Sequence, residues 1–227
     1  MKIDMLLEGK PFMTEFGIVG YSSVVLIQTE DGNNILYDCG SKGCALQLKE
    51  ALRKVGLTPE QISHLVISHL HFDHVGNLPL FSNAEVLLSE TEWKIAGNTP
   101  DEWHSIPTLA YLEKYGNMQF VKEGDEIAPG VSVMALPGHT AGLIGLWCGA
   151  DTILCSDALK NRYEAWKDIP LMSQDLEKSR QSIRRIKENA RYIYPGHDAV
   201  LDVRHPNAEE HPGTRIRYAD GYTVICP

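Results

Sequence analysis

The chain has 227 residues, of which 43% are hydrophobic and 22% are charged, which is ordinary for a globular protein with a sizeable core. The 30 acidic and 21 basic side chains give a formal net charge of −9, so nucleic acid would be repelled unless a local basic patch compensated. No stretch predicts a membrane span, and residues 1–8 do not have the form of a signal peptide, which together favour a cytoplasmic location.

The five cysteines are scattered, without the spacing of a metal finger, at positions 39, 44, 148, 155 and 226. Cys39, Cys148 and Cys155 lie in or beside apolar, strand-like runs, so we predict that they are reduced core residues. No linker or low-complexity tract divides the chain. We therefore expect a single domain over residues 1–227.

The first part of the chain predicts a hairpin and then a helix. Apolar residues at 24–27 predict a strand, turn residues follow at 31–34, and residues 35–37 predict a second strand that ends at Asp38. Leucines at a mostly helical spacing then predict a helix over about 46–55.

The middle of the chain predicts two strands and a helix. The apolar runs 65–67 and 84–88 predict buried strands, and residues 89–92 have the form of a capping box that opens a helix through about residue 96. Residues 97–117 then mix aromatic residues with prolines. Two interpretations of that segment stay open, an insertion that packs over the core or a wall of a substrate pocket.

The last part of the chain predicts four strands and a helix. Strands are expected at 131–136, 143–148, 152–155 and 192–194, and a helix is expected to follow Ser173 as its cap. Two tail histidines, each before a proline, are predicted to lie at the surface: His205 and His211.

A polar run directly after the strand at 65–67 holds four potential metal ligands within six positions: His69, His71, Asp73 and His74. In an extended segment, positions two apart point the same way, so His69 and His71 can converge on one metal. Asp73 and His74 follow after the chain turns and can face a second point nearby. Imidazoles and a carboxylate suit zinc, with iron and manganese as alternatives.

The pattern His69-x-His71-x-Asp73-His74 resembles the second motif of the metallo-β-lactamase superfamily. The four remaining motifs of that family have counterparts in the same order, at Asp38, at Pro137-Gly138-His139-Thr140, at Asp157 and at Pro195-Gly196-His197-Asp198. The resemblance implies an α/β (α+β) fold, a four-layer αββα sandwich of two mixed sheets with the metals at one edge.

The resemblance also implies a role for each of these side chains. One metal would be held by His69, His71 and His139. The other would be held by Asp73, His74 and His197. Asp157 would bridge the two metals, and Asp38 would orient a ligand.

A site of this kind implies a hydrolase with two Zn²⁺ ions and a metal-bridging hydroxide that attacks a small ester, lactone or thioester. The expected partner is a small-molecule substrate, and a homo-oligomer is compatible with the sequence. The alternatives are a phosphodiesterase or nuclease on the same metals, which the acidic composition disfavours, and iron-dependent sulfur oxidation.

Departures from the family motifs narrow the choice of substrate. The β-lactamases of the superfamily lack the bridging aspartate, so Asp157 argues against β-lactam hydrolysis. Acyl-homoserine lactonases share the Gly196-His197-Asp198 ending, but they carry a tyrosine where this chain has Lys160. Glyoxalase-II-like thioesterases share the second and third motifs, whereas their C-terminal segment has no evident counterpart here.

Lys160 completes the predicted catalytic set with Asp73 and Asp157. It follows Asp157 by three residues, so we expect it near the pocket. A cation beside two metals is unfavourable unless an anion lies between them. Lys160, with Arg162, is therefore predicted to bind a carboxylate or phosphate of the substrate; the alternatives are that Tyr163 provides the donor or that Lys160 points into solvent.

Overall fold

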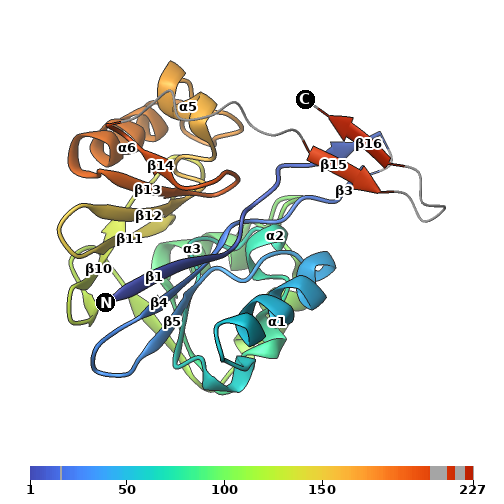
Figure 1. Cartoon of the computed structure of the whole chain (residues 1–227), viewed down its shortest axis with the longest axis vertical. Coiled ribbons are helices and arrows are strands. Elements are labelled where there is room, and N and C mark those ends of the chain that lie inside the picture. The colour runs from blue at the N-terminus through green and yellow to red at the C-terminus, as the bar shows by residue number, and fades with distance from the viewer. Residues whose placement is uncertain (16, 205–213, 218–222, 227) are drawn as a thin grey trace.

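Two six-stranded sheets lie face to face with helices on their outer surfaces (Figure 1). The computed structural model describes residues 1–15, 17–204, 214–217 and 223–226. The layers are those of an αββα sandwich of the α/β class, which confirms the predicted fold. Within the described ranges, no helix is long and apolar enough to cross a membrane.

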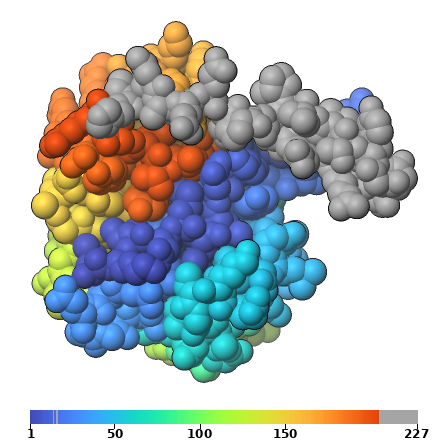
Figure 2. Space-filling model, viewed as in Figure 1, coloured from blue at the N-terminus to red at the C-terminus, as the bar shows by residue number. Residues whose placement is uncertain are grey.

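The first sheet combines an antiparallel edge with a parallel half. β1–β4–β5 are antiparallel neighbours, and β5–β6–β7–β8 run parallel. The predicted hairpin is the β4–β5 pair. In order across the sheet the strands are β1 (Lys2–Leu7), β4 (Val24–Gln28), β5 (Asn34–Tyr37), β6 (His64–Val66), β7 (Glu85–Ser89) and β8 (Met118–Val121). Figure 2 shows β1, in dark blue, at the surface where the two halves of the chain meet.

The second sheet is antiparallel except where β12 and β13 run side by side in the same direction. In order its strands are β14 (Leu201–Asp202), β13 (Tyr192–Pro195), β12 (Thr152–Ser156), β11 (Ile144–Cys148), β10 (Val131–Ala135) and β9 (Glu126–Ala128). Two small hairpins complete the strands, β2 (Met13–Thr14) with β3 (Gly17–Ile18) and β15 (Thr214–Arg217) with β16 (Thr223–Cys226).

Helices connect the parallel strands, because such connections must cross over the sheet. The α-helices are α1 (Ala45–Lys54), α2 (Phe72–Val75), α3 (Glu90–Asn98), α4 (Ile106–Glu113), α5 (Arg162–Lys167) and α6 (Leu176–Asn189). Single 3₁₀ turns are η1 (Lys42–Cys44), η2 (Pro59–Gln61) and η3 (Leu78–Leu80).

One predicted helix start is wrong. The helix for which Ser173 is the expected cap begins at Leu176, and its cap is Asp175, whose side chain accepts from the backbone N–H of Lys178 at 3.1 Å. The Ser173 hydroxyl instead donates to the Leu171 carbonyl, so it is not available to cap the helix.

Three apolar clusters fill the spaces between the four layers. The first, which contains Leu52, joins the first sheet to α1, and the second joins the inner faces of the sheets, for example Ile27 with Leu146. The third contains Ile186 and joins the second sheet to α6. Each fully buried aliphatic side chain contributes roughly 1.5–3 kcal/mol. These close-packed clusters hold the strands whose ends carry the polar loop residues.

The cysteine predictions hold where they can be examined. Cys39, Cys148 and Cys155 are free, buried core residues, and Cys44 is buried as well. The predicted surface histidines, His205 and His211, lie outside the residues that the structure describes, and the side chain of Cys226 is also not described.

Candidate metal centre and substrate cavity

The seven predicted ligand side chains gather at one edge of the sandwich. His69 and His71 follow β6, His139 follows β10, Asp157 follows β12 and His197 follows β13. Asp73 and His74 lie in the short helix α2. The ends of strands in the two sheets therefore bring together residues that lie up to 128 positions apart in the sequence, from His69 to His197.

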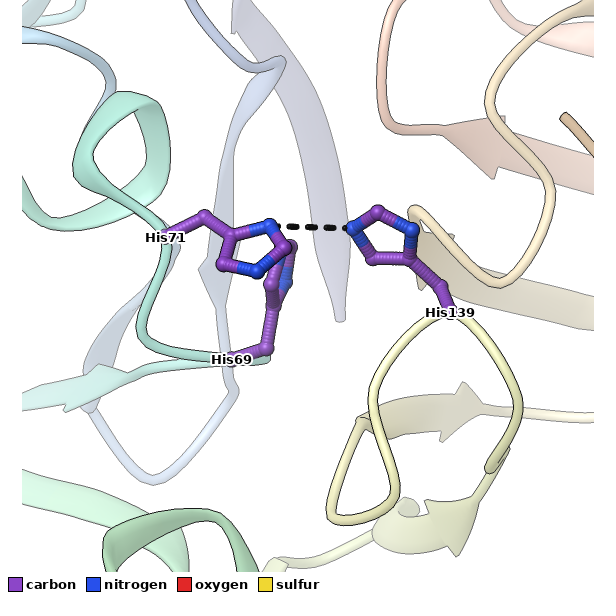
Figure 3. Close-up of side chains that lie close together, drawn as sticks. All are labelled: His69, His71 and His139. Carbon is purple, nitrogen blue, oxygen red and sulfur yellow. Dashed lines mark hydrogen bonds between the residues drawn. The ribbon is translucent and has the colours of Figure 1, made fainter. Parts of the chain in front are cut away.

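Three histidines form the first group (Figure 3). His69, His71 and His139 each offer a ring nitrogen within 4.8 Å of the others. The Nδ1 atom of His71 lies 3.1 Å from the Nε2 atom of His139. Two nitrogens bound to one zinc at about 2.0–2.1 Å would be separated by a similar distance. The three rings can therefore hold one ion.

A carboxylate and two histidines form the second group. Asp73, His74 and His197 also place their ligand atoms within 4.8 Å of one another. An oxygen of Asp73 lies 3.7 Å from Nε2 of His74 and 3.5 Å from Nε2 of His197. This mixed oxygen and nitrogen set suits a second divalent cation.

Asp157 lies between the two groups and turns one oxygen to each. Its Oδ2 atom is 3.5 Å from Nε2 of His139, in the first group. Its Oδ1 atom is 3.4 Å from Nε2 of His74 and 3.3 Å from Nε2 of His197, in the second. The close approach of the chain at Gly196 fixes this pose, because a Cβ there would overlap Oδ1 of Asp157. Asp157 thus has the geometry of a bridging carboxylate.

Most of the histidines have a hydrogen-bond partner on the nitrogen that faces away from the centre. Such partners fix the ring orientation and the tautomer of a ligand. The Nδ1 atom of His69 contacts the Ser68 hydroxyl, and that of His74 contacts the Asp38 carboxylate. The Nδ1 atom of His139 contacts the Met172 carbonyl, and that of His197 contacts the Tyr21 carbonyl.

Asp38 is the hub of a buried network behind His74. Its Oδ1 accepts from the Ser68 N–H, and its Oδ2 lies 2.8 Å from Nδ1 of His74 and accepts from the hydroxyls of Ser68 and Ser156. Asp38 and Ser156 both have left-handed backbone angles, with φ of 58° and 46°. Such strain persists only where surrounding contacts impose it.

Burial lowers the pKa of each histidine in the first group. The pKa of His69 falls well below its usual range, that of His71 falls to about 2 and that of His139 falls to about 4. Desolvation is the main cause in each case, since burial disfavours the charged imidazolium. These rings are neutral at neutral pH, which is the state that binds a metal.

The second group behaves in the opposite way. Burial alone would lower the pKa values of His74 and His197, but the negative charges of Asp157 and Asp73 raise both. Burial would raise the pKa of Asp157, but His197 and His74 hold it well below its usual range. A concentration of negative charge at this point is what a bound cation would neutralise.

Several buried polar atoms of the cluster find no hydrogen-bond partner among the described residues. They are the Nε2 atoms of His69 and His74, and Oδ1 of Asp157. Buried polar atoms are almost always paired, so unpaired ones that converge on a point indicate a missing ligand. The donor set therefore fits divalent metal ions.

A cavity of about 480 Å³ opens over the centre. Five apolar side chains form much of its wall: Phe12, Met13, Ile18, Trp103 and Met172. Polar residues at its base and rim include His71, Asp73, Asp101, Glu102, His139, Asp157, Lys160, Ser173, Gln174 and His197. Lys160 is the one Lys or Arg among these described lining residues.

The segment 97–117 has both of the roles that the sequence left open. Asp101, Glu102 and Trp103 line the cavity, so this part is a wall of the pocket. The helix α4 and Tyr115 pack against the first apolar cluster.

Lys160 is buried, so the alternative in which it points into solvent is wrong. Its ammonium donates to the carbonyls of Leu171, at 2.7 Å, and Asp157, at 3.3 Å, and lies 3.6 Å from the Glu164 carboxylate. Glu164 is therefore a negatively charged partner of Lys160 within the protein.

The two residues considered alongside Lys160 lie elsewhere. Arg162 forms a bidentate ion pair with Asp198, with two contacts of 2.8 Å. Tyr163 is 49% exposed and is not among the described lining residues.

Sequence reasoning missed several residues that support the cluster. Ser68 and Ser156 each directly precede a predicted ligand, and that adjacency was the available signal. Glu92 was assigned only to a helix cap, although its carboxylate contacts two ligand loops. The outer nitrogen of His71 lies 3.9 Å from Asp101, whose position in an irregular segment gave no signal.

The family assignment agrees with this arrangement. A family model described as the metallo-β-lactamase superfamily matches residues 17–197. The chain therefore belongs to the metallo-β-lactamase superfamily. Family membership and the histidine–aspartate cluster together support a metal-dependent hydrolase.

Named relatives are of two kinds. An N-acyl homoserine lactonase from a Bacillus species is 30% identical over 158 residues, which cover 65% of this chain and 60% of the lactonase. The match thus spans less than two thirds of that relative. Metallo-beta-lactamase domain-containing protein 1 of Xenopus laevis is 29% identical over 215 residues, which cover 87% of this chain and 84% of that protein.

A solved structure shows the same fold. It is an AiiA variant from B. thuringiensis with N-decanoyl-L-homoserine bound at its active site. The TM-score is 0.68 at 22% sequence identity, and the alignment covers 86% of this chain and 92% of the other.

Proposed function

We propose that the protein hydrolyses a small carboxylic ester, with a lactone as the preferred substrate and a thioester as the alternative. The observation that carries this proposal is the position of Asp157, with one carboxylate oxygen toward each group of ligands. The likeness to N-acyl homoserine lactonases favours a lactone that bears an acyl chain.

The proposed ligand sets are His69, His71 and His139 for one ion, and Asp73, His74 and His197 for the other, with Asp157 shared. Zinc is the proposed metal, because neutral imidazoles and carboxylates are its usual ligands. Two such ions, when bound, polarise a carbonyl and make water nucleophilic at neutral pH.

Three side chains of the protein are proposed to position the ligand groups, transfer a proton and bind the substrate. Asp157 holds the two ligand groups at a fixed separation. Asp73 faces the cavity, where its carboxylate can hold a proton on its way to the leaving alcohol. Lys160 lines the cavity and is proposed to bind a carboxylate of the substrate or product, which requires its ammonium to leave the Leu171 carbonyl.

The cavity favours a carbonyl substrate over a phosphodiester. Phe12, Met13, Ile18, Trp103 and Met172 offer an apolar wall against which an aliphatic chain can pack. A phosphodiester would need several cationic contacts, whereas Lys160 is the one such lining residue in the described part and already has Glu164 as a partner. We also propose a cytoplasmic location, on the basis of the free, buried cysteines.

A hydrolase screen tests the proposal. Zinc-loaded protein is assayed against acyl-homoserine lactones, acyl thioesters and phosphodiesters at matched concentrations. The expected result is highest kcat/KM on a lactone, with a chain-length dependence that reflects the apolar wall. Turnover of a phosphodiester above both carbonyl classes would reject the proposal in favour of the nuclease alternative.

A further inference from the structure

Glu92 is a buried carboxylate that lies outside the predicted ligand set. It is 2% exposed and occupies the third position of α3, beside the loops that follow β6 and β10. Burial of a carboxylate is unfavourable unless hydrogen bonds compensate, so the identity of its partners is informative.

The hydrogen-bond partners of the Glu92 carboxylate all belong to loops that carry candidate ligands. Its Oε1 atom accepts from the backbone N–H of Leu70, at 3.1 Å. Its Oε2 atom accepts from the hydroxyl of Thr140, at 2.8 Å, and from the N–H of Gly142, at 3.2 Å. Leu70 lies between His69 and His71, and Thr140 directly follows His139.

The loop after β10 is shaped to approach Glu92 closely. A Cβ at position 142 would overlap the backbone of Glu92, so glycine is required for this contact. The capping-box pattern is also diverted from its usual use. Ser89 accepts from the N–H of Glu92 as a cap does, but the carboxylate of Glu92 is directed to the loops instead.

We propose that Glu92 is a positioning residue that fixes the loop of His69 and His71 against the loop of His139, and thereby sets the metal affinity of the three-histidine group. The inference rests on the metal centre of the proposed function. A carboxylate is required because three donors converge on two oxygens, and a glutamine would present an amide N–H₂ to one or more of them.

The proposal predicts selectivity between the two groups of ligands. Glu92 ties together the loops that carry all three histidines of the first group. Its described hydrogen bonds do not reach the loop of His197, and the orientation of His74 depends on Asp38. Loss of Glu92 should therefore weaken the first group far more than the second.

Single-site backgrounds measure this selectivity. His197→Ala disables the second group and leaves the first, whereas His139→Ala does the reverse. Zinc dissociation constants are measured by competition with a chromophoric chelator, with and without Glu92→Gln. We expect a roughly 10- to 100-fold weakening in the His197→Ala background, the range typical of residues that orient ligands, and less than about threefold in the His139→Ala background.

Equal weakening of zinc binding in both backgrounds would show that Glu92 has only a general structural role. Unchanged zinc binding in both would show that Glu92 does not affect the metal centre. Glu90→Gln is the matched control, because Glu90 is in the same helical turn but is exposed and paired with Lys94. It should leave both constants unchanged.

A second variant covers the case in which Glu92→Gln does not fold. Thr140→Val removes one of the three donors and leaves the carboxylate in place, so a smaller loss with the same selectivity is expected. A Thr140→Val protein without this selectivity would overturn the proposal. Failure of the wild type to bind zinc would instead contradict the metal centre itself, a distinct result.

Discussion

At the scale of single residues, the candidate site is organised by carboxylates that are shared between neighbours. Asp157 faces both ligand groups, Asp38 accepts from the residues behind His74, and Glu92 joins two loops. Each is buried, and each carries several partners. Substitution of one such residue should therefore affect more than one contact at a time.

Asp157 is the residue on which catalysis should depend most. Asp157→Ala removes the proposed bridge and leaves most of the other ligands, so the hydrolysis rate should fall at least about a hundredfold, as for loss of a major electrostatic element. The measurement is kcat of the zinc-loaded variant, with metal content determined in parallel. Near-normal turnover with both metals retained would refute the bridging role.

A comparison of two substrates can distinguish a role of Lys160 in substrate binding from its role in structural contacts. A charge-assisted hydrogen bond contributes roughly 1.5–3 kcal/mol, so Lys160→Met should lower kcat/KM about ten- to a hundredfold on an anionic substrate. It should lower kcat/KM little on a matched neutral ester. Equal losses on both would mean that Lys160 acts through its contacts with Leu171 and Glu164 rather than on the substrate.

At the scale of elements, the strands that carry the candidate ligands could be predicted from the sequence, but most of the hydrogen bonds behind those residues could not. The hairpin β4–β5 and the strand β6 have local apolar patterns, and His69 to His74 lie in one short run. Asp38 and Ser156, by contrast, meet across 118 positions, and no local pattern encodes such a contact.

Helix α4 was missed for a specific reason. Pro107 suggested a break, whereas it occupies the first turn of the helix behind the cap Ser105, where proline is tolerated. The edge strands β1 and β8 were also missed, because they are short or only partly buried and their patterns are mixed.

The turn after β13 gives a prediction at this scale. Gly196→Ala adds a Cβ that would overlap Oδ1 of Asp157, so the carboxylate must move away from its two neighbours. We expect weaker binding of zinc with little change in apo-protein stability. Gly97→Ala is the control, since nothing lies within 4 Å of a Cβ there. Equal zinc affinities for the two variants would show that the pose of Asp157 does not need Gly196.

At the scale of the whole molecule, the candidate metal centre is built from residues of both sheets. The first sheet carries His69, His71, Asp73 and His74, and the second carries His139, Asp157 and His197. Because the unfolded chain cannot form this set of ligands, metal binding should stabilise the folded state. If the chain is a single domain, as predicted, both sheets should also unfold together.

Calorimetry tests this coupling. Zinc-loaded protein should melt in one transition, and removal of zinc by a chelator should lower the Tm, with recovery on addition of zinc. Two separate transitions, of which only one responds to zinc, would show that the sheets unfold as independent units.

The proposed centre holds two metal ions with seven side chains: His69, His71, Asp73, His74, His139, Asp157 and His197. Its most direct test is the metal content of carefully purified protein after reconstitution of the apo-protein with zinc and removal of unbound ions. Two zinc ions per chain are expected. One ion or none after full reconstitution would rule out a centre of two metals.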